Sequence, residues 1–157
     1  MNFELKLIVI GLLLCSAASA SAASETPDNL VERGRYLAKV TGCNDCHTAG
    51  YAQAGGNLDE SLWLTGDQLG WRGPWGTSYS TNLRLRVADM SLDQWLTLIE
   101  VMQPRPPMPW FNLRAMTRED QTALFQYLKH LGPAGEPAPE WLPPDQTPPP
   151  PFVQFPG

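Results

Sequence analysis

The chain has 157 residues, of which 16 are Asp or Glu and 11 are Lys or Arg, so its formal net charge at pH 7 is -5. It lacks the basic balance of a nucleic-acid-binding protein, which argues against nucleic acid as a partner. Three cysteines are too few for a framework of several disulfides, and Cys15 stands apart from Cys43 and Cys46 in an apolar N-terminal stretch.

The first 22 residues have the pattern of a secretory signal peptide. Lys6 precedes an apolar run over 7–14, and a stretch of small residues follows it. The run is too short to cross a bilayer, which takes about 20 residues; an uncleaved anchor helix is the alternative. The bulky Leu14 disfavours lipidation of Cys15. We therefore predict a signal peptide over residues 1–22, export to the periplasm, and no transmembrane span in the mature chain.

A first helix is predicted over residues 27–42, where Pro27 suits the first turn and Asp28 complements the helix dipole. Gly42 ends this helix just before a C-x-x-C-H motif, Cys43 to His47. This spacing is typical of c-type haem attachment. Each thiol can add to one vinyl group of the porphyrin, and the histidine that follows can ligate the iron.

Three other interpretations of the motif compete with haem. A structural zinc site needs four ligands, whereas the motif supplies three and the other histidine is His130. A thioredoxin-like redox pair belongs beside a βαβ pattern, but here the flanks predict helix and glycine-rich loop. A simple disulfide between Cys43 and Cys46 stays open. The motif, the export signal and the helical context together favour one covalent haem c.

The middle of the chain, residues 48–90, is rich in glycine and tryptophan and has little helical periodicity. A long loop region within a compact domain is usually functional, and wrapping a large planar cofactor would be such a function. Helices then begin at Ser91, with Gln94 completing a capping-box pattern, and at Thr117, with Gly132 as the stop. We predict an all-α domain over 27–133, with three to five helices.

A second axial ligand for the iron must come from farther along the chain. Met108 lies among prolines, which restrict the backbone and would hold its thioether at low ordering cost. The other candidates are His130, near the end of the last helix, and Met90, Met102 and Met116, for which packing is the default role. We predict Met108 as the ligand.

The segment 134–157 is rich in proline and has no apolar periodicity. This composition predicts polyproline II or an irregular tail, not a packed core. We expect the tail to be dispensable for haem attachment, and to dock a partner or to lie across the surface.

Several stretches in the same order resemble class I cytochromes c: residues 32–37, the attachment motif with Thr48, residues 73–77 through 82–83, residues 108–110 and residues 124–132. More narrowly, the chain is similar to the single-haem domains in cytochrome subunits of bacterial periplasmic alcohol and sugar-acid dehydrogenases. It departs from the multi-haem subunits in having one attachment motif and no anchoring helix, so a freely diffusing carrier is the alternative to a subunit of a complex.

The resemblance implies roles for individual residues. Gly34 would permit a close crossing of the first and last helices near Tyr127. The carbonyl of Pro74 would accept a hydrogen bond from the free imidazole nitrogen of His47. Met108 would be the distal iron ligand.

The leading hypothesis is a monohaem electron carrier, not an enzyme, that passes single electrons between periplasmic redox partners such as a dehydrogenase or a terminal oxidase. Four acids accompany six arginines in residues 67–118, and such a locally basic region would suit an acidic partner. Alternatively, Arg72 or Arg84 pairs with haem propionates. The competing function is a haem protein with an open iron site that binds a small ligand, as a sensor or in peroxide-type chemistry.

Overall fold

The computed structural model describes residues 27–157. The predicted signal peptide and Cys15 lie outside this range. Within it, every helix is too short or too polar to cross a membrane.

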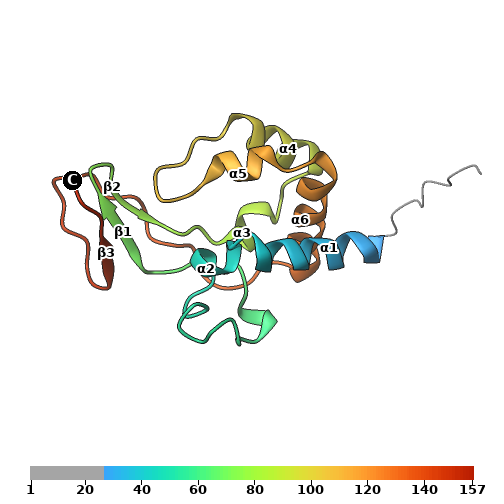
Figure 1. Ribbon diagram of the computed structural model, residues 1–157, viewed down its shortest axis with the longest axis horizontal. Coiled ribbons are helices and arrows are strands. Elements are labelled where there is room, and N and C mark those ends of the chain that lie inside the picture. The colour runs from blue at the N-terminus through green and yellow to red at the C-terminus, as the bar shows by residue number, and fades with distance from the viewer. Residues whose placement is uncertain (1–26) are drawn as a thin grey trace, which may run out of the picture.

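The first and last helices cross closely (Figure 1). Helix α1 spans Pro27–Val40 and α6 spans Arg118–Leu131. Gly34 lies at the crossing, and a Cβ there would come within 2.6 Å of the Tyr127 Cβ. The expected close approach at Gly34 is therefore confirmed. An ion pair of 2.9 Å between Arg33 and Asp120 joins the same two helices at the surface.

Four further α-helices lie between α1 and α6: α2 (Cys43–His47), α3 (Leu83–Val87), α4 (Leu92–Val101) and α5 (Trp110–Ala115). Ser91 and Gln94 form the predicted capping box of α4. A 3-10 turn, η1, covers Glu60–Leu62. The described residues thus contain six α-helices instead of three to five. The number was underestimated because α2, α3 and α5 have only five or six residues, too few to show helical periodicity.

A small sheet makes the all-α prediction only roughly right. Strands β1 (Gly70–Gly73) and β2 (Gly76–Tyr79) form an antiparallel hairpin, and β3 (Phe152–Gln154) runs parallel to β1, giving the order β2-β1-β3. Strands of three or four residues with several glycines carry no readable alternation. One of them also lies far along the chain, so no local pattern predicts the sheet.

The proline-rich segment is largely irregular, as predicted, but it also pairs with the hairpin. Leu142 and Thr77 exchange both backbone hydrogen bonds, 2.8 and 3.0 Å, on the free side of β2. The chain then passes round the hairpin and adds β3 to the other side (Figure 1). Backbone pairing needs no apolar periodicity, which is why composition alone did not predict it.

The hydrophobic core lies between α1, α4 and α6 and includes Leu37, Trp95, Ile99 and Leu128. The indole of Trp95 donates to the carbonyl of Gln121 at 2.9 Å, so this buried ring is also satisfied.

Candidate cofactor-binding site

The attachment motif forms a short helix of its own. Gly42 takes a left-handed conformation at φ 77°, which turns the chain from α1 into α2. Cys43 and Cys46 are both free thiols, so the alternative of a disulfide between them is not supported. Among residues 27–157 no group of three or more metal-binding side chains is assembled, which also disfavours zinc. Burial raises the pKa of both thiols.

His47 is oriented by a carbonyl from the chain that enters α3. Its Nδ1 lies 2.7 Å from the Thr81 oxygen. Because a carbonyl only accepts, Nδ1 carries the proton and the Nε2 lone pair is available to a metal. The side chain is 9% exposed, and burial lowers the pKa of the imidazole, which favours the neutral form that ligates.

The expected partner of His47 was Pro74, and that prediction is wrong. Pro74 lies in the turn between β1 and β2, whereas the hydrogen bond to Nδ1 goes to Thr81. The shift has a simple geometric reason: β2 leads the chain back from the hairpin, and residues 80–81 then pass the histidine.

The back of α2 is held by a second set of hydrogen bonds. The Thr48 hydroxyl donates to Asn44 at 2.7 Å and accepts from the backbone of Leu64 at 2.8 Å. The amide of Gly66 donates to the His47 carbonyl at 2.8 Å. The loop over residues 64–66 therefore holds the motif in place.

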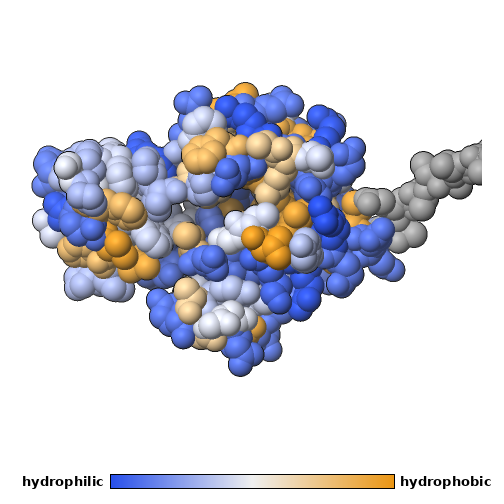
Figure 2. Space-filling model, viewed as in Figure 1, coloured by the Kyte–Doolittle hydropathy of each residue, from blue (hydrophilic) through white to orange (hydrophobic). Residues whose placement is uncertain are grey.

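Cys43, Cys46 and His47 all border one cavity of about 890 Å³. Its other walls come from the hairpin, from α4 and α6, from the loop over 102–109 and from the C-terminal segment. Figure 2 shows a hollow near the middle of this face, between the lobe that carries the sheet and the helices. A cavity of this size, mostly apolar, is typical of a cofactor site.

Three methionines border the cavity: Met102 at the end of α4, Met108 in the proline-rich loop, and Met116 at the end of α5. Met108 is half-buried, with Pro107 and Pro109 beside it on the cavity wall. His130 is exposed and does not line the cavity. The structure thus leaves three thioethers as candidates and removes the histidine.

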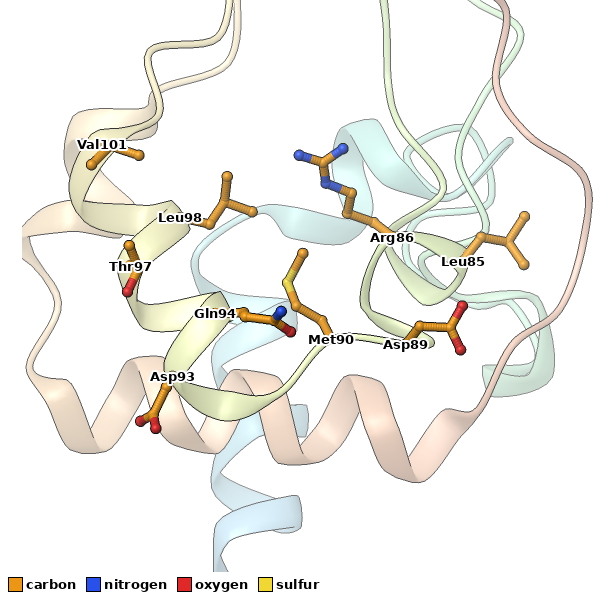
Figure 3. Close-up of a pocket in the computed structure, with 9 residues that line it drawn as sticks. All are labelled: Leu85, Arg86, Asp89, Met90, Asp93, Gln94, Thr97, Leu98 and Val101. Atoms are coloured by element: carbon orange, nitrogen blue, oxygen red, sulfur yellow. The ribbon is translucent and has the colours of Figure 1, made fainter.

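A second hollow, of about 640 Å³, lies between α3 and α4 and is drawn in Figure 3. Met90, Leu98 and Val101 form part of its wall, and Asp89 and Asp93 lie along its edge. It lacks the cysteines and the histidine of the motif. The two hollows share Arg86 and Leu98, but Met90 does not line the cavity that holds the motif.

The arginines divide into structural and cavity-lining groups. Arg84 is buried and donates to the carbonyls of Ser61, Leu131 and Gly132, each at 2.6 Å, so its guanidinium is occupied by the fold. Arg72 lies on β1 and does not border the cavity. Arg86 and Arg105 do. Neither Arg72 nor Arg84 lines the cavity, so the alternative in which one of them pairs with haem propionates is not supported.

The family model for cytochrome c matches residues 31–132. The chain belongs to the cytochrome c family. It is 31% identical over 130 residues to the cytochrome c subunit of a quinone-type alcohol dehydrogenase from Gluconacetobacter polyoxogenes, covering 73% of this chain and 25% of that one. It is 30% identical over 135 residues to a gluconate 2-dehydrogenase cytochrome c subunit from Pantoea cypripedii, covering 78% and 27%.

The chain thus spans about a quarter of the length of the curated relatives that it matches. No solved structure matches it significantly. Both of these relatives are named as cytochrome c subunits of dehydrogenases.

A cytochrome c domain implies covalently bound haem c, and the cavity fits this group. Two buried polar atoms on cavity-lining residues, the indole nitrogen of Trp71 and the hydroxyl of Ser78, have no hydrogen-bond partner within the described chain. Buried polar groups are nearly always paired. We therefore infer that these two donors need an acceptor from outside the described chain. The propionate carboxylates of haem are such acceptors.

Three parts of the site escaped sequence reasoning: the Thr81 carbonyl, the cavity-lining Arg86, and Pro139 with Trp141 from the C-terminal segment. A backbone carbonyl carries no sequence signal. Trp141 did carry a sequence signal, because a large aromatic side chain is unexpected in a proline-rich tail that packs against nothing.

Proposed function

We propose that this cytochrome carries a single haem c and transfers single electrons between redox partners in the periplasm. The observation that carries the proposal is the convergence of both motif thiols and the oriented imidazole of His47 on one cavity. An additional, enzymatic role is not needed to explain any of these residues.

Each residue of the motif has a distinct task in this proposal. Cys43 and Cys46 would anchor the cofactor through thioether bonds, and His47 would ligate the iron through Nε2, while the Thr81 carbonyl accepts from Nδ1 and holds the ring. Haem supplies an iron that alternates between the ferric and ferrous states. The protein's own contribution is to fix the ligands, exclude water and orient the group toward a partner.

We assign Met108 as the second axial ligand. The loop that carries it is stiffened by Pro106, Pro107 and Pro109, so little conformational entropy is lost when the thioether is held in place. Met102 and Met116 border the same cavity but directly follow helices that pack against the core. With both axial positions filled, the iron is suited to electron transfer rather than to binding a substrate, and His/Met ligation raises the reduction potential.

A dehydrogenase is the partner class that the relatives favour, because those named above are dehydrogenase subunits. A terminal oxidase would serve as the acceptor at the other end of the transfer. Arg86 and Arg105 at the cavity provide positive charge on a protein whose net charge is -5. We therefore expect a partner with an acidic surface around its electron-transfer site.

The first prediction concerns covalent attachment. The exported protein, purified from a host with haem-attachment machinery, should keep its haem through acid-acetone extraction, because both thiols bind it. The Cys43→Ser/Cys46→Ser double variant is the control and should release any haem that it holds. Extraction of haem from the wild-type protein would contradict the proposal.

A spectrum of the reduced protein with and without carbon monoxide separates the electron carrier from a ligand-binding haem protein. A filled second axial position predicts almost no change on adding carbon monoxide. Rapid, complete binding by the wild-type protein would favour the open-site alternative instead.

A further inference from the structure

Trp141 is fixed to the hairpin that forms one wall of the cavity. Its indole nitrogen donates to the Trp75 carbonyl at 2.9 Å, and the next residue, Leu142, exchanges two backbone hydrogen bonds with Thr77. The fit is tight, since a Cβ on Gly76 would lie 2.7 Å from the indole nitrogen of Trp141. The C-terminal segment therefore holds this ring in a defined place, although 40% of the side chain is exposed.

The outer face of the same ring contacts the loop that carries Met108. The guanidinium carbon of Arg105 lies 4.0 Å from the Trp141 ring centroid, which is a close cation-π contact. Within the described chain, residues 103–107 make no hydrogen bond to any other segment. The contact between Arg105 and Trp141 thus links the middle of this loop to the C-terminal segment.

Trp141, Arg105 and Met108 border the same cavity. A stiff loop keeps its shape, but stiffness alone does not keep it against the cavity. The contact at Arg105 holds the chain three residues before Met108. Because Pro106 and Pro107 restrict the backbone between these two residues, the contact also limits how far the Met108 thioether can move away from the cavity.

From these contacts we propose that Trp141 is a positioning residue for the second axial ligand: through Arg105 it holds the 102–109 loop closed, so that the Met108 thioether stays at the iron. The inference rests on the proposed function, in which Met108 ligates haem. It gives the C-terminal segment a role in setting the properties of the cofactor and not only in stabilising the sheet.

The test measures carbon monoxide association with the reduced haem protein, together with the charge-transfer band that sulfur-iron ligation gives near the red end of the ferric spectrum. Trp141→Ala should bind carbon monoxide about two- to fivefold faster than the wild type, since an exposed cation-π contact corresponds to roughly that change in population. The band should weaken while the haem stays covalently attached. Trp141→Phe, which keeps an aromatic face for Arg105, should lie between the two.

Phe152→Ala is the matched control, because Phe152 is an aromatic residue of the same segment with 36% of its side chain exposed and does not border the cavity. It should leave both readings unchanged. A Trp141→Ala protein with the wild-type association rate and band would overturn the inference, as would an equal effect from Phe152→Ala.

A double variant shows whether the two side chains act through one contact. Arg105→Ala combined with Trp141→Ala should behave like either single variant in carbon monoxide association, and their shifts in urea unfolding midpoint should be non-additive. Additive effects in both measurements would refute the proposed contact. The unfolding midpoint can be measured whether or not Met108 binds the iron. If wild-type protein lacked the band yet the midpoints were non-additive, the Met108 assignment would fail while the contact itself stood.

Discussion

One neighbouring oxygen atom sets the protonation of the His47 ring. The Thr81 oxygen, 2.7 Å from Nδ1, selects the tautomer that leaves Nε2 free. The C-x-x-C-H spacing specifies which residue faces the iron, but the carbonyl that orients it belongs to a loop 34 positions away. The sequence therefore singled out His47 as the candidate proximal ligand but not the carbonyl that orients it, because any residue offers a carbonyl and only the course of the chain decides which one lies beside the ring.

Met108 gives the sharpest test at this scale. Met108→Ala should abolish the charge-transfer band, lower the reduction potential and open the iron to carbon monoxide, while the haem stays covalently bound. Met102→Ala should keep the band and lower the free energy of unfolding by about 2 kcal/mol, at the low end for a Met→Ala change because the side chain is only half-buried.

Met116→Ala serves as a second control, since Met116 also borders the cavity. It too should keep the band. If either control lost the band and Met108→Ala retained it, the ligand would come from a helix end instead of from the proline-rich loop.

Three elements meet at Glu60, in η1. Its carboxylate accepts from the Tyr127 hydroxyl of α6 at 2.7 Å and from Arg35 of α1 at 2.9 Å. Periodicity predicted both of these helices, because long amphipathic stretches carry a readable pattern, and the resemblance to cytochromes c implied their close crossing at Gly34. The 3-10 turn that joins them lay inside the segment treated as loop, so this cluster could not be predicted.

The cluster makes stability depend on pH. Burial alone would raise the pKa of Glu60, but the hydrogen bonds from Tyr127 and Arg35 outweigh it and hold the pKa below its ordinary value of 4.5. A carboxyl with a depressed folded-state pKa stabilises the fold above the unfolded-state pKa and loses that contribution as the pH falls. Urea midpoints should therefore decline below about pH 4.5 in the wild type.

Glu60→Gln should lower the midpoint at neutral pH and show a smaller decline in acid, since it cannot take up the proton. Asp93→Asn is a suitable control, because Asp93 makes no ion pair within the described residues and lies at the edge of the other hollow. An equal acid decline in Glu60→Gln and wild type would show that other carboxylates control it.

At the scale of the whole molecule, the C-terminal segment packs along the hairpin and closes part of the cavity. It touches both sides of the hairpin and adds Pro139 and Trp141 to the cavity wall. The domain predicted over 27–133 thus contains the motif and the main helices but not the full enclosure of the site. The sequence could not show this, since the segment is held by backbone pairing and by single aromatic contacts instead of by an apolar stripe.

Truncation after Pro133 should leave covalent haem attachment intact, because α2 is fixed by residues 48–81 and not by the C-terminal segment. The truncated protein should nevertheless unfold at lower urea concentration, since an isolated two-stranded hairpin is marginally stable. Haem staining of denatured protein and urea titration give the two readings. Loss of covalent haem would show that the segment is needed earlier, for the attachment itself.

The course of the C-terminal segment also bears on self-association. A sheet with an open edge offers unpaired backbone groups to a second chain. Here the two edge strands, β2 and β3, have only four and three residues, and Leu142 pairs with Thr77 on the outer side of β2. Pro151 precedes it and Pro156 follows closely, and neither has an N–H to offer. Although Phe152 and Val153 are partly exposed, residues 27–157 thus present no long strand on which a second copy could pair.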